Sequence, residues 1–60
     1  MKTYPKFKPG DLVRSTGLAG NLVIVLKRRW IEDYALWHYF VVFQHNGHKA
    51  WFSENWFRRT

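Results

Sequence analysis

The chain has 60 residues, with ten Lys and Arg against four Asp and Glu, no Cys, and 20% aromatic residues. This length allows one domain, and an apolar share of 47% is too high for a disordered basic tail. The lack of Cys excludes a disulfide-stabilised mini-protein and any thiolate metal site, while the formal net charge of +6 favours an acidic partner.

The first nine residues contain two Pro and three Lys without a hydrophobic period. Because proline removes a backbone donor and keeps its predecessor extended, we expect an extended basic arm over residues 1–9 and a single domain over residues 10–60. The N-terminal charges are followed by no apolar stretch, and the longest apolar run, 22–26, is far below the ~20 residues of a membrane span. We therefore expect a cytoplasmic location and no membrane partner.

Three strands are expected in the next part of the chain. A turn at 9–11 precedes a strand over 12–16, and a loop between Gly17 and Gly20 precedes a central strand over 22–26 that runs into 27–30. Residues 31–36 permit either one helical turn or a β connection. We favour the β connection, because strong strand formers flank this segment, and we expect the next strand over 37–44.

The pair Asn46-Gly47 between strand formers predicts a two-residue type I′ hairpin. In that register the numbers of paired residues sum to 93, so that Phe43 faces Ala50 and Val41 faces Phe52. One sheet face then belongs to the core, and its members are Tyr39, Val41, Phe43, Ala50 and Phe52. The opposite face holds His38, Phe40, Val42, Gln44, Lys49, Trp51 and Ser53.

A short helical turn is expected at 53–56, with the Ser53 side chain capping its free amides and Trp56 or Phe57 closing the end of a barrel. The expected fold is therefore all-β, with four to five antiparallel strands and a short C-terminal helical turn. A sheet this small hides its edges best by curling into a barrel.

Several motifs resemble those of small SH3-like barrels of the KOW and Tudor type. They are the opening F-x-x-G-D-x-V at 7–13, Gly17-x-x-Gly20 before an apolar strand, and the strand and hairpin motifs at 39–54. The resemblance covers residues 7–57 and implies an SH3-like barrel. It extends to short phage-encoded proteins, which would place the chain in the host cytoplasm. The aromatic cage of methyl-lysine readers has no residue-by-residue match here, so no ligand residue is carried over.

The sequence holds no pattern typical of catalysis. Glu32 and Asp33 are adjacent and would point to opposite faces of a strand, so they cannot act as an acid–base pair. His45 and His48 share a strand face at the hairpin, but a metal site needs three or four ligands, and we interpret them as exposed turn residues. We expect no enzymatic activity, no metal or other cofactor and no small-molecule substrate.

The basic residues alternate with aromatic ones, as in surfaces whose cations contact phosphates and whose rings stack on bases. For any single cluster, the alternative is that the cations only solvate the surface while the aromatics form the core. The candidate binding residues are Lys27, Arg28, Arg29, Trp30, Phe40, Lys49, Trp51, Arg58 and Arg59.

These residues fit two functions. The first is a nucleic-acid-binding barrel of low sequence specificity, in which the cations neutralise phosphates while Trp30 and Phe40 stack on bases. The second is a protein-interaction module, such as a phage-type accessory factor on a host or viral complex, which would use Trp30, Trp37 or Trp51 as anchors and add a strand at the sheet edge. We favour the first because of the net charge.

Overall fold

The structure, a computed structural model, describes residues 2–17 and 20–59, with only the backbone of Arg59 included. The described residues form an all-β fold of five antiparallel strands with one 3₁₀ turn near the C-terminus, as the sequence predicts. The elements in chain order are β1 (Leu12–Ser15), β2 (Leu22–Ile31), β3 (Leu36–Phe43), β4 (Lys49–Ser53), η1 (Glu54–Trp56) and β5 (Phe57–Arg59).

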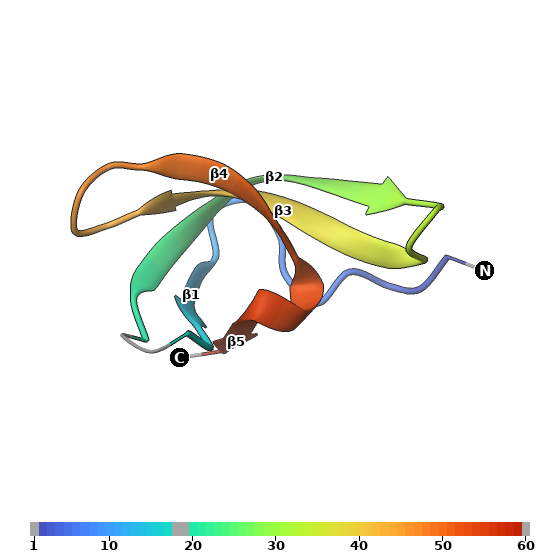
Figure 1. Cartoon of the computed structure of the whole chain (residues 1–60), viewed down its shortest axis with the longest axis horizontal. Helices are drawn as coiled ribbons and strands as arrows, with labels where there is room; N and C mark the ends of the chain where they lie inside the picture. Colours follow the sequence, from blue (N-terminus) through green and yellow to red (C-terminus); the bar gives the residue numbers. More distant parts are fainter. Residues whose placement is uncertain (1, 18–19, 60) are drawn as a thin grey trace.

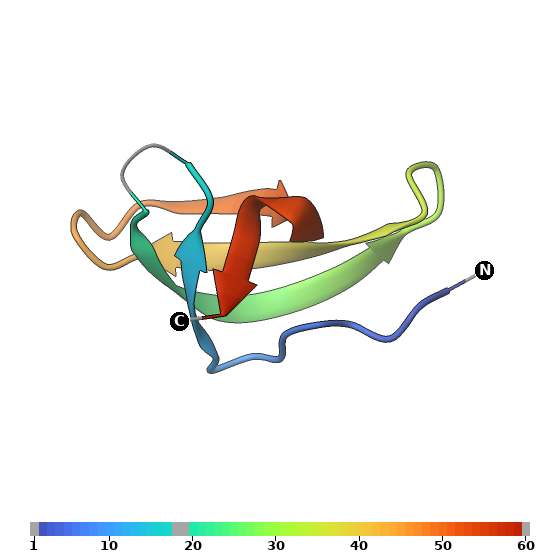
Figure 2. The same cartoon turned by 90° about the horizontal axis from the view of Figure 1, so that it is seen from below.

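The strands form one sheet in the order β4-β3-β2-β1-β5, with β4 and β5 at its two edges. Figure 1 shows that the sheet is strongly curled, with β2, β3 and β4 above and β1 and β5 folded beneath them. In Figure 2 the N-terminal arm runs beside β2 along the length of the molecule. The sheet therefore has an outer, convex face and an inner face that encloses the core.

The core lies inside this curl. The accessible surface of the whole protein, 4353 Å², is close to the roughly 4,200 Å² that the chain mass predicts. The members of the core alternate along the strands, as expected for a sheet with one buried face. The buried hydrophobic residues of the described chain are Phe7, Val13, Val23, Val25, Trp37, Tyr39, Val41 and Phe57. Phe43 and Phe52 pack against them, so the expected inner face of β3 and β4 is confirmed.

The turn before β1 and the turn after β2 agree with the expectations from the sequence. Gly10 has φ +94°, and its amide donates to the Val25 carbonyl at 2.7 Å, which connects the turn at 9–11 to the centre of β2. After β2, Ile31 pairs with Leu36 around a turn over residues 32–35. The connection is thus the β connection and not a helical turn.

The β3–β4 hairpin differs from the predicted two-residue turn. The observed pairs, such as Val41 with Ala50 and Tyr39 with Phe52, sum to 91 and not to 93. The Gly47 amide donates to the Phe43 carbonyl at 2.8 Å around a four-residue loop in which Gly47 has φ +73°. A type I′ turn requires a positive φ at both central residues, and Asn46 does not have one. Instead, the Asn46 Oδ1 accepts a hydrogen bond from the His48 amide at 2.8 Å.

A β-bulge in β2 changes which side chains point outward. Residues up to Val25 and from Lys27 onward pair with β3 in different registers, so Leu26 is an extra residue in the strand. In a regular strand the side chain of Lys27 would point toward the core, as those of Val23 and Val25 do. Because of the extra residue, Arg28 points toward the inner side and Lys27 points outward. The apolar run at 22–26 has no alternation from which this bulge could be predicted.

The C-terminal turn closes the open end of the curled sheet. Ser53 occupies the N-cap position, but its side chain makes no capping hydrogen bond, so the predicted cap is wrong. Of the two aromatic candidates, Phe57 is buried in the core, whereas Trp56 is half exposed and contacts the ring of Phe52 at 5.9 Å. Phe57 meets Tyr39 and Phe7 in edge-to-face contacts at 6.3 and 6.4 Å.

The N-terminal arm is attached to the core by a buried polar network. The Tyr39 hydroxyl accepts hydrogen bonds from the amides of Lys6 and Phe7 at 3.1 and 3.3 Å and donates to the Glu54 carboxylate at 2.9 Å. Further along the arm, the Trp37 indole donates to the Thr3 carbonyl at 2.6 Å. The boundary at residue 9 stays a prediction, but Phe7 of the arm belongs to the core.

Candidate nucleic-acid interface

Five of the candidate residues meet on the convex face of β2, β3 and β4. In the observed register Phe40 of β3 pairs with Lys27 of β2 and with Trp51 of β4. The three residues therefore form one row across three strands. Arg29 lies two positions beyond Lys27 on β2, and Lys49 lies two positions before Trp51 on β4. We call this set, Lys27, Arg29, Phe40, Lys49 and Trp51, the outer patch.

The row at the centre of the outer patch is packed. The rings of Phe40 and Trp51 lie 5.3 Å apart at 41°, and the Lys27 ammonium lies 5.9 Å from the Phe40 ring centre. Phe40 is half-buried by these neighbours, whereas Trp51 stays 42% exposed. An indole held by a neighbouring ring and open to solvent offers a flat apolar surface of fixed position.

Among the described residues, no Asp or Glu lies on β2, β3 or β4. Glu54 is buried in η1, where it binds the Tyr39 hydroxyl, and Asp11 accepts from the Lys8 amide in the turn before β1. Glu32 and Asp33 lie in the turn that joins β2 to β3. The cations of the outer patch are therefore separated from the chain's acidic residues, and the positive potential of this face is not cancelled locally.

The basic run at 27–30 is divided between the two sides of the sheet. Arg28 and Trp30 pair with Tyr39 and Trp37, which are core residues, so they belong to the inner side. The Arg28 guanidinium donates to the Phe7 carbonyl at 3.2 Å, and the Trp30 ring packs against Trp37 at 5.8 Å. These two residues therefore lie on the other side of the sheet from Lys27 and Arg29.

The C-terminal basic residues form a separate region. Arg58 on β5 pairs with Arg14 of β1, on the part of the sheet folded beneath β3 and β4. Arg14 is itself bound to the Gly20 carbonyl at 2.7 Å. Arg59 pairs with Val13 through its backbone, and its side chain lies outside the described structure. The structure thus does not bring 58–59 together with the outer patch.

The two hairpin histidines have a packing role in the structure. The rings of His45 and His48 both lie against Phe43, with centres 6.0 and 6.2 Å from it. Over residues 2–17 and 20–59, no three His, Asp or Glu side chains come together as metal ligands would. In the same residues, no helix is long and apolar enough to cross a membrane.

Sequence reasoning found the members of the outer patch but not the contact between Lys27 and Phe40. The face of β3 and β4 follows from alternation alone, and it places Phe40, Lys49 and Trp51 together. The position of Lys27 opposite Phe40 depends on the bulge in β2, for which the apolar run offers no signal. The second grouping that was missed, Lys2 beside Arg28 and Trp37, requires the path of the arm.

No protein-family model matches the chain, and no curated protein or solved structure is similar enough to it to count as a match. The fold and the site therefore define a class and no more. The class is a small all-β domain whose convex sheet face carries cations beside an exposed aromatic ring.

Proposed function

We propose that this protein is a non-enzymatic nucleic-acid-binding module that uses its outer patch. The observation that carries the proposal is the row of Lys27, Phe40 and Trp51 across three strands, flanked by Arg29 and Lys49, on a face without carboxylates. Cations and a half-exposed aromatic ring on one sheet face are what a low-specificity binding surface needs: charges for the phosphates and a π face for a base.

The fold supports this proposal without identifying the function. Five antiparallel strands in the order β4-β3-β2-β1-β5, with a 3₁₀ turn before the last strand, are compatible with a small SH3-like barrel of the kind that the opening motif resembles. We place the chain in that group as part of the proposal, together with its likeness to short phage-encoded proteins. The function is argued from the outer patch, because one fold carries many functions.

The geometry favours single-stranded nucleic acid. The Phe40 ring lies against the Trp51 ring at 41°, and Trp51 stays 42% exposed, so a base must leave its duplex stack to lie on this indole. Lys27, Arg29 and Lys49 lie on the same sheet face as this ring and would contact the phosphates on either side of the stacked base. In a duplex the bases are stacked on each other, so only the phosphate contacts would remain.

Fluorescence anisotropy with a labelled single-stranded oligonucleotide carrying a 5′-hydroxyl tests the proposal. Three phosphate contacts give a slope of log K against log salt of about −2 for single strands, so affinity should fall about 20-fold between ~50 and ~200 mM salt. Lys49→Ala should weaken binding and make the slope less steep by about 0.7. Trp51→Ala should cost about 1–3 kcal/mol of binding free energy.

Lys2→Ala is the matched control, because it removes one positive charge from the arm, away from the outer patch. It should leave the slope and the affinity close to the wild-type values. Equal losses for Lys2→Ala and Lys49→Ala would contradict the proposal, because binding would then depend on net charge and not on this surface.

The second candidate function is docking of a protein at the edge strand β4. Its support is that β4 has β3 on one side only and carries Trp51, which is 42% exposed, while Trp56 in the following turn is 51% exposed. Of the expected anchors, Trp37 is buried and unavailable. Capture of a partner from nuclease-treated lysate that is lost on Trp51→Ala and kept at moderate salt would favour this function.

A further inference from the structure

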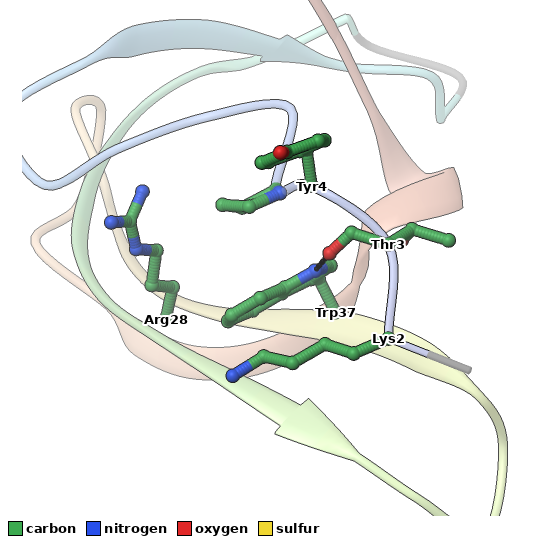
Figure 3. Close-up of a pocket in the computed structure, with 6 residues that line it drawn as sticks. Lys2, Thr3, Tyr4, Arg28 and Trp37 are labelled. Atoms are coloured by element: carbon green, nitrogen blue, oxygen red, sulfur yellow. Dashed lines mark hydrogen bonds between the residues drawn. The ribbon is translucent and has the colours of Figure 1, made fainter.

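The arm and the inner side of β2 and β3 enclose a groove that the outer patch does not use. It consists of two adjoining hollows of about 430 and 460 Å³, which share Pro5 and Arg28 in their linings. The first hollow, which we call the arm groove, is lined by Lys2, Thr3, Tyr4, Pro5, Arg28 and Trp37. Figure 3 shows Tyr4 across from the Trp37 ring, with Arg28 and Lys2 reaching toward one end of that ring.

The arm groove concentrates positive charge around one aromatic ring. The Lys2 ammonium lies 5.0 Å from the centre of the Trp37 ring, and the Arg28 guanidinium carbon lies 5.9 Å from a Trp37 ring. The residues that line the hollow include no Asp or Glu to balance these cations. Two like charges near one ring repel each other, and an anion between them would remove that repulsion.

The position of the ring and of Arg28 is fixed before any ligand arrives. The Trp37 indole donates to the Thr3 carbonyl and packs edge-on against Trp30, and Arg28 donates to the Phe7 carbonyl. On the other side of the groove, Tyr4 is 95% exposed, so its ring is available to cover a planar ligand. A preorganised site of this kind loses little free energy in ordering its own side chains on binding.

We propose that the arm groove binds a nucleotide, with its phosphate between Lys2 and Arg28 and its base against Tyr4. A phosphate satisfies the paired cations, since guanidinium and ammonium groups are its usual partners. A planar base can stack on the exposed ring of Tyr4. The nucleotide is free in solution or is the 5′ end of a strand, and it is bound without reaction. This inference does not rest on the proposed function, because Arg28 and Trp37 lie on the inner side of the sheet.

The test follows the Trp37 indole N–H in proton–nitrogen correlation spectra of the isotope-labelled protein. Adenosine 5′-monophosphate should shift this signal saturably, while inorganic phosphate and adenosine should each bind more weakly. Lys2→Ala should weaken nucleotide binding about fivefold, at the upper end for one surface ion pair. Arg58→Ala, the matched control, removes one exposed positive charge from β5 and should leave nucleotide binding unchanged. Tyr4→Ala should weaken the nucleotide but not inorganic phosphate.

Three results would overturn the inference: no shift of the Trp37 signal, equal losses for Lys2→Ala and Arg58→Ala, or phosphate binding as tightly as the nucleotide. A 5′-phosphorylated oligonucleotide that binds here more tightly than the mononucleotide would identify the strand end as the ligand. Tighter binding of the mononucleotide would identify the free nucleotide. The outer patch is tested with a 5′-hydroxyl strand and the arm groove with a mononucleotide, so one proposal can fail while the other holds.

Discussion

At the scale of single residues, Tyr39 connects the arm, the sheet and the C-terminal turn. Its side chain is fully buried, and its hydroxyl bonds the Lys6 and Phe7 amides on one side and Glu54 on the other. Replacing the hydroxyl with hydrogen leaves the buried carboxylate with the Lys6 amide at 3.3 Å as its remaining described partner. A buried polar group that loses its hydrogen-bond partner destabilises the folded state by its full desolvation free energy.

We therefore expect Tyr39→Phe to lower the free energy of unfolding by about 2–4 kcal/mol, which is a large part of the about 3–9 kcal/mol expected for 60 residues. Urea unfolding followed by tryptophan fluorescence measures the loss. Tyr34→Phe, at an exposed position in the β2–β3 turn, is the matched control and should change stability by less than about 0.5 kcal/mol. A loss for Tyr39→Phe no larger than that of the control would contradict this role.

The same side chain predicts a loss of stability at high pH. Burial, followed by the neighbouring Glu54 carboxylate, raises the pKa of Tyr39 from 10.0 to about 12, although the Phe7 amide acts against them. The unfolded chain therefore releases a proton near pH 10 that the folded chain keeps until about pH 12. Stability from this group is complete below pH 10 and falls as the pH rises toward 12, by up to about 3 kcal/mol.

Urea unfolding at pH 8, 10 and 11 checks this effect, with Tyr39→Phe as the reference for all other titrating groups. The wild-type protein should lose stability more steeply than the variant, so that the gap between them narrows above pH 10. Parallel curves for the two proteins would show that Tyr39 is not the group responsible.

At the scale of elements, the β3–β4 hairpin shows how a correct face can come with a wrong register. The residue numbers of each pair sum to 93 in the predicted register and to 91 in the observed one. A shift of two residues keeps every side chain on its face, because side chains alternate along a strand. The alternation of Tyr39, Val41 and Phe43 therefore sufficed to assign the core. The loop was wrong because Asn-Gly serves more than one turn: here Gly47 alone is left-handed, and Asn46 bonds the His48 amide.

Gly47→Ala tests this loop directly. Gly47 has φ +73°, and a β-carbon at this position would meet no atom within 4 Å, so the cost comes from the backbone alone. We expect a loss of about 1 kcal/mol in the free energy of unfolding. Gly17→Ala, where φ is not positive and the nearest atom is Ser15 Oγ at 3.9 Å, is the matched control and should cost less. Equal losses of stability for the two variants would show that the loss at Gly47 does not come from its left-handed backbone conformation.

The bulge in β2 marks the limit of what the sequence could predict about the candidate site. Alternation assigns Phe40, Lys49 and Trp51 to one face, but the run 22–26 is apolar throughout and hides the extra residue at Leu26. The directions of Lys27 and Arg28 depend on that residue, and so does the division of the basic run between the outer patch and the arm groove. A local insertion of this kind is decided by pairing with β3, which single-strand patterns do not contain.

At the scale of the whole molecule, the charges are separated along an elongated body of 35 × 19 × 17 Å. The exposed carboxylates of Glu32 and Asp33 lie at the β2–β3 turn, which extends beyond the rest of the sheet in Figure 1. The described cations are spread over the convex face, the arm, the inner side of β2, β1 and β5. The net charge of +6 therefore does not form one continuous surface, and binding must be tested surface by surface.

The four tryptophan indole N–H signals provide that test in one titration with the 5′-hydroxyl single strand at ~50 mM salt. Trp51 is on the outer patch, Trp37 and Trp30 are on the inner side, and Trp56 is in the C-terminal turn. The proposed function predicts that the Trp51 signal shifts most, and that the shift disappears at ~500 mM salt as the phosphate contacts are screened. Shifts confined to the other three signals, or no shift at all, would contradict it.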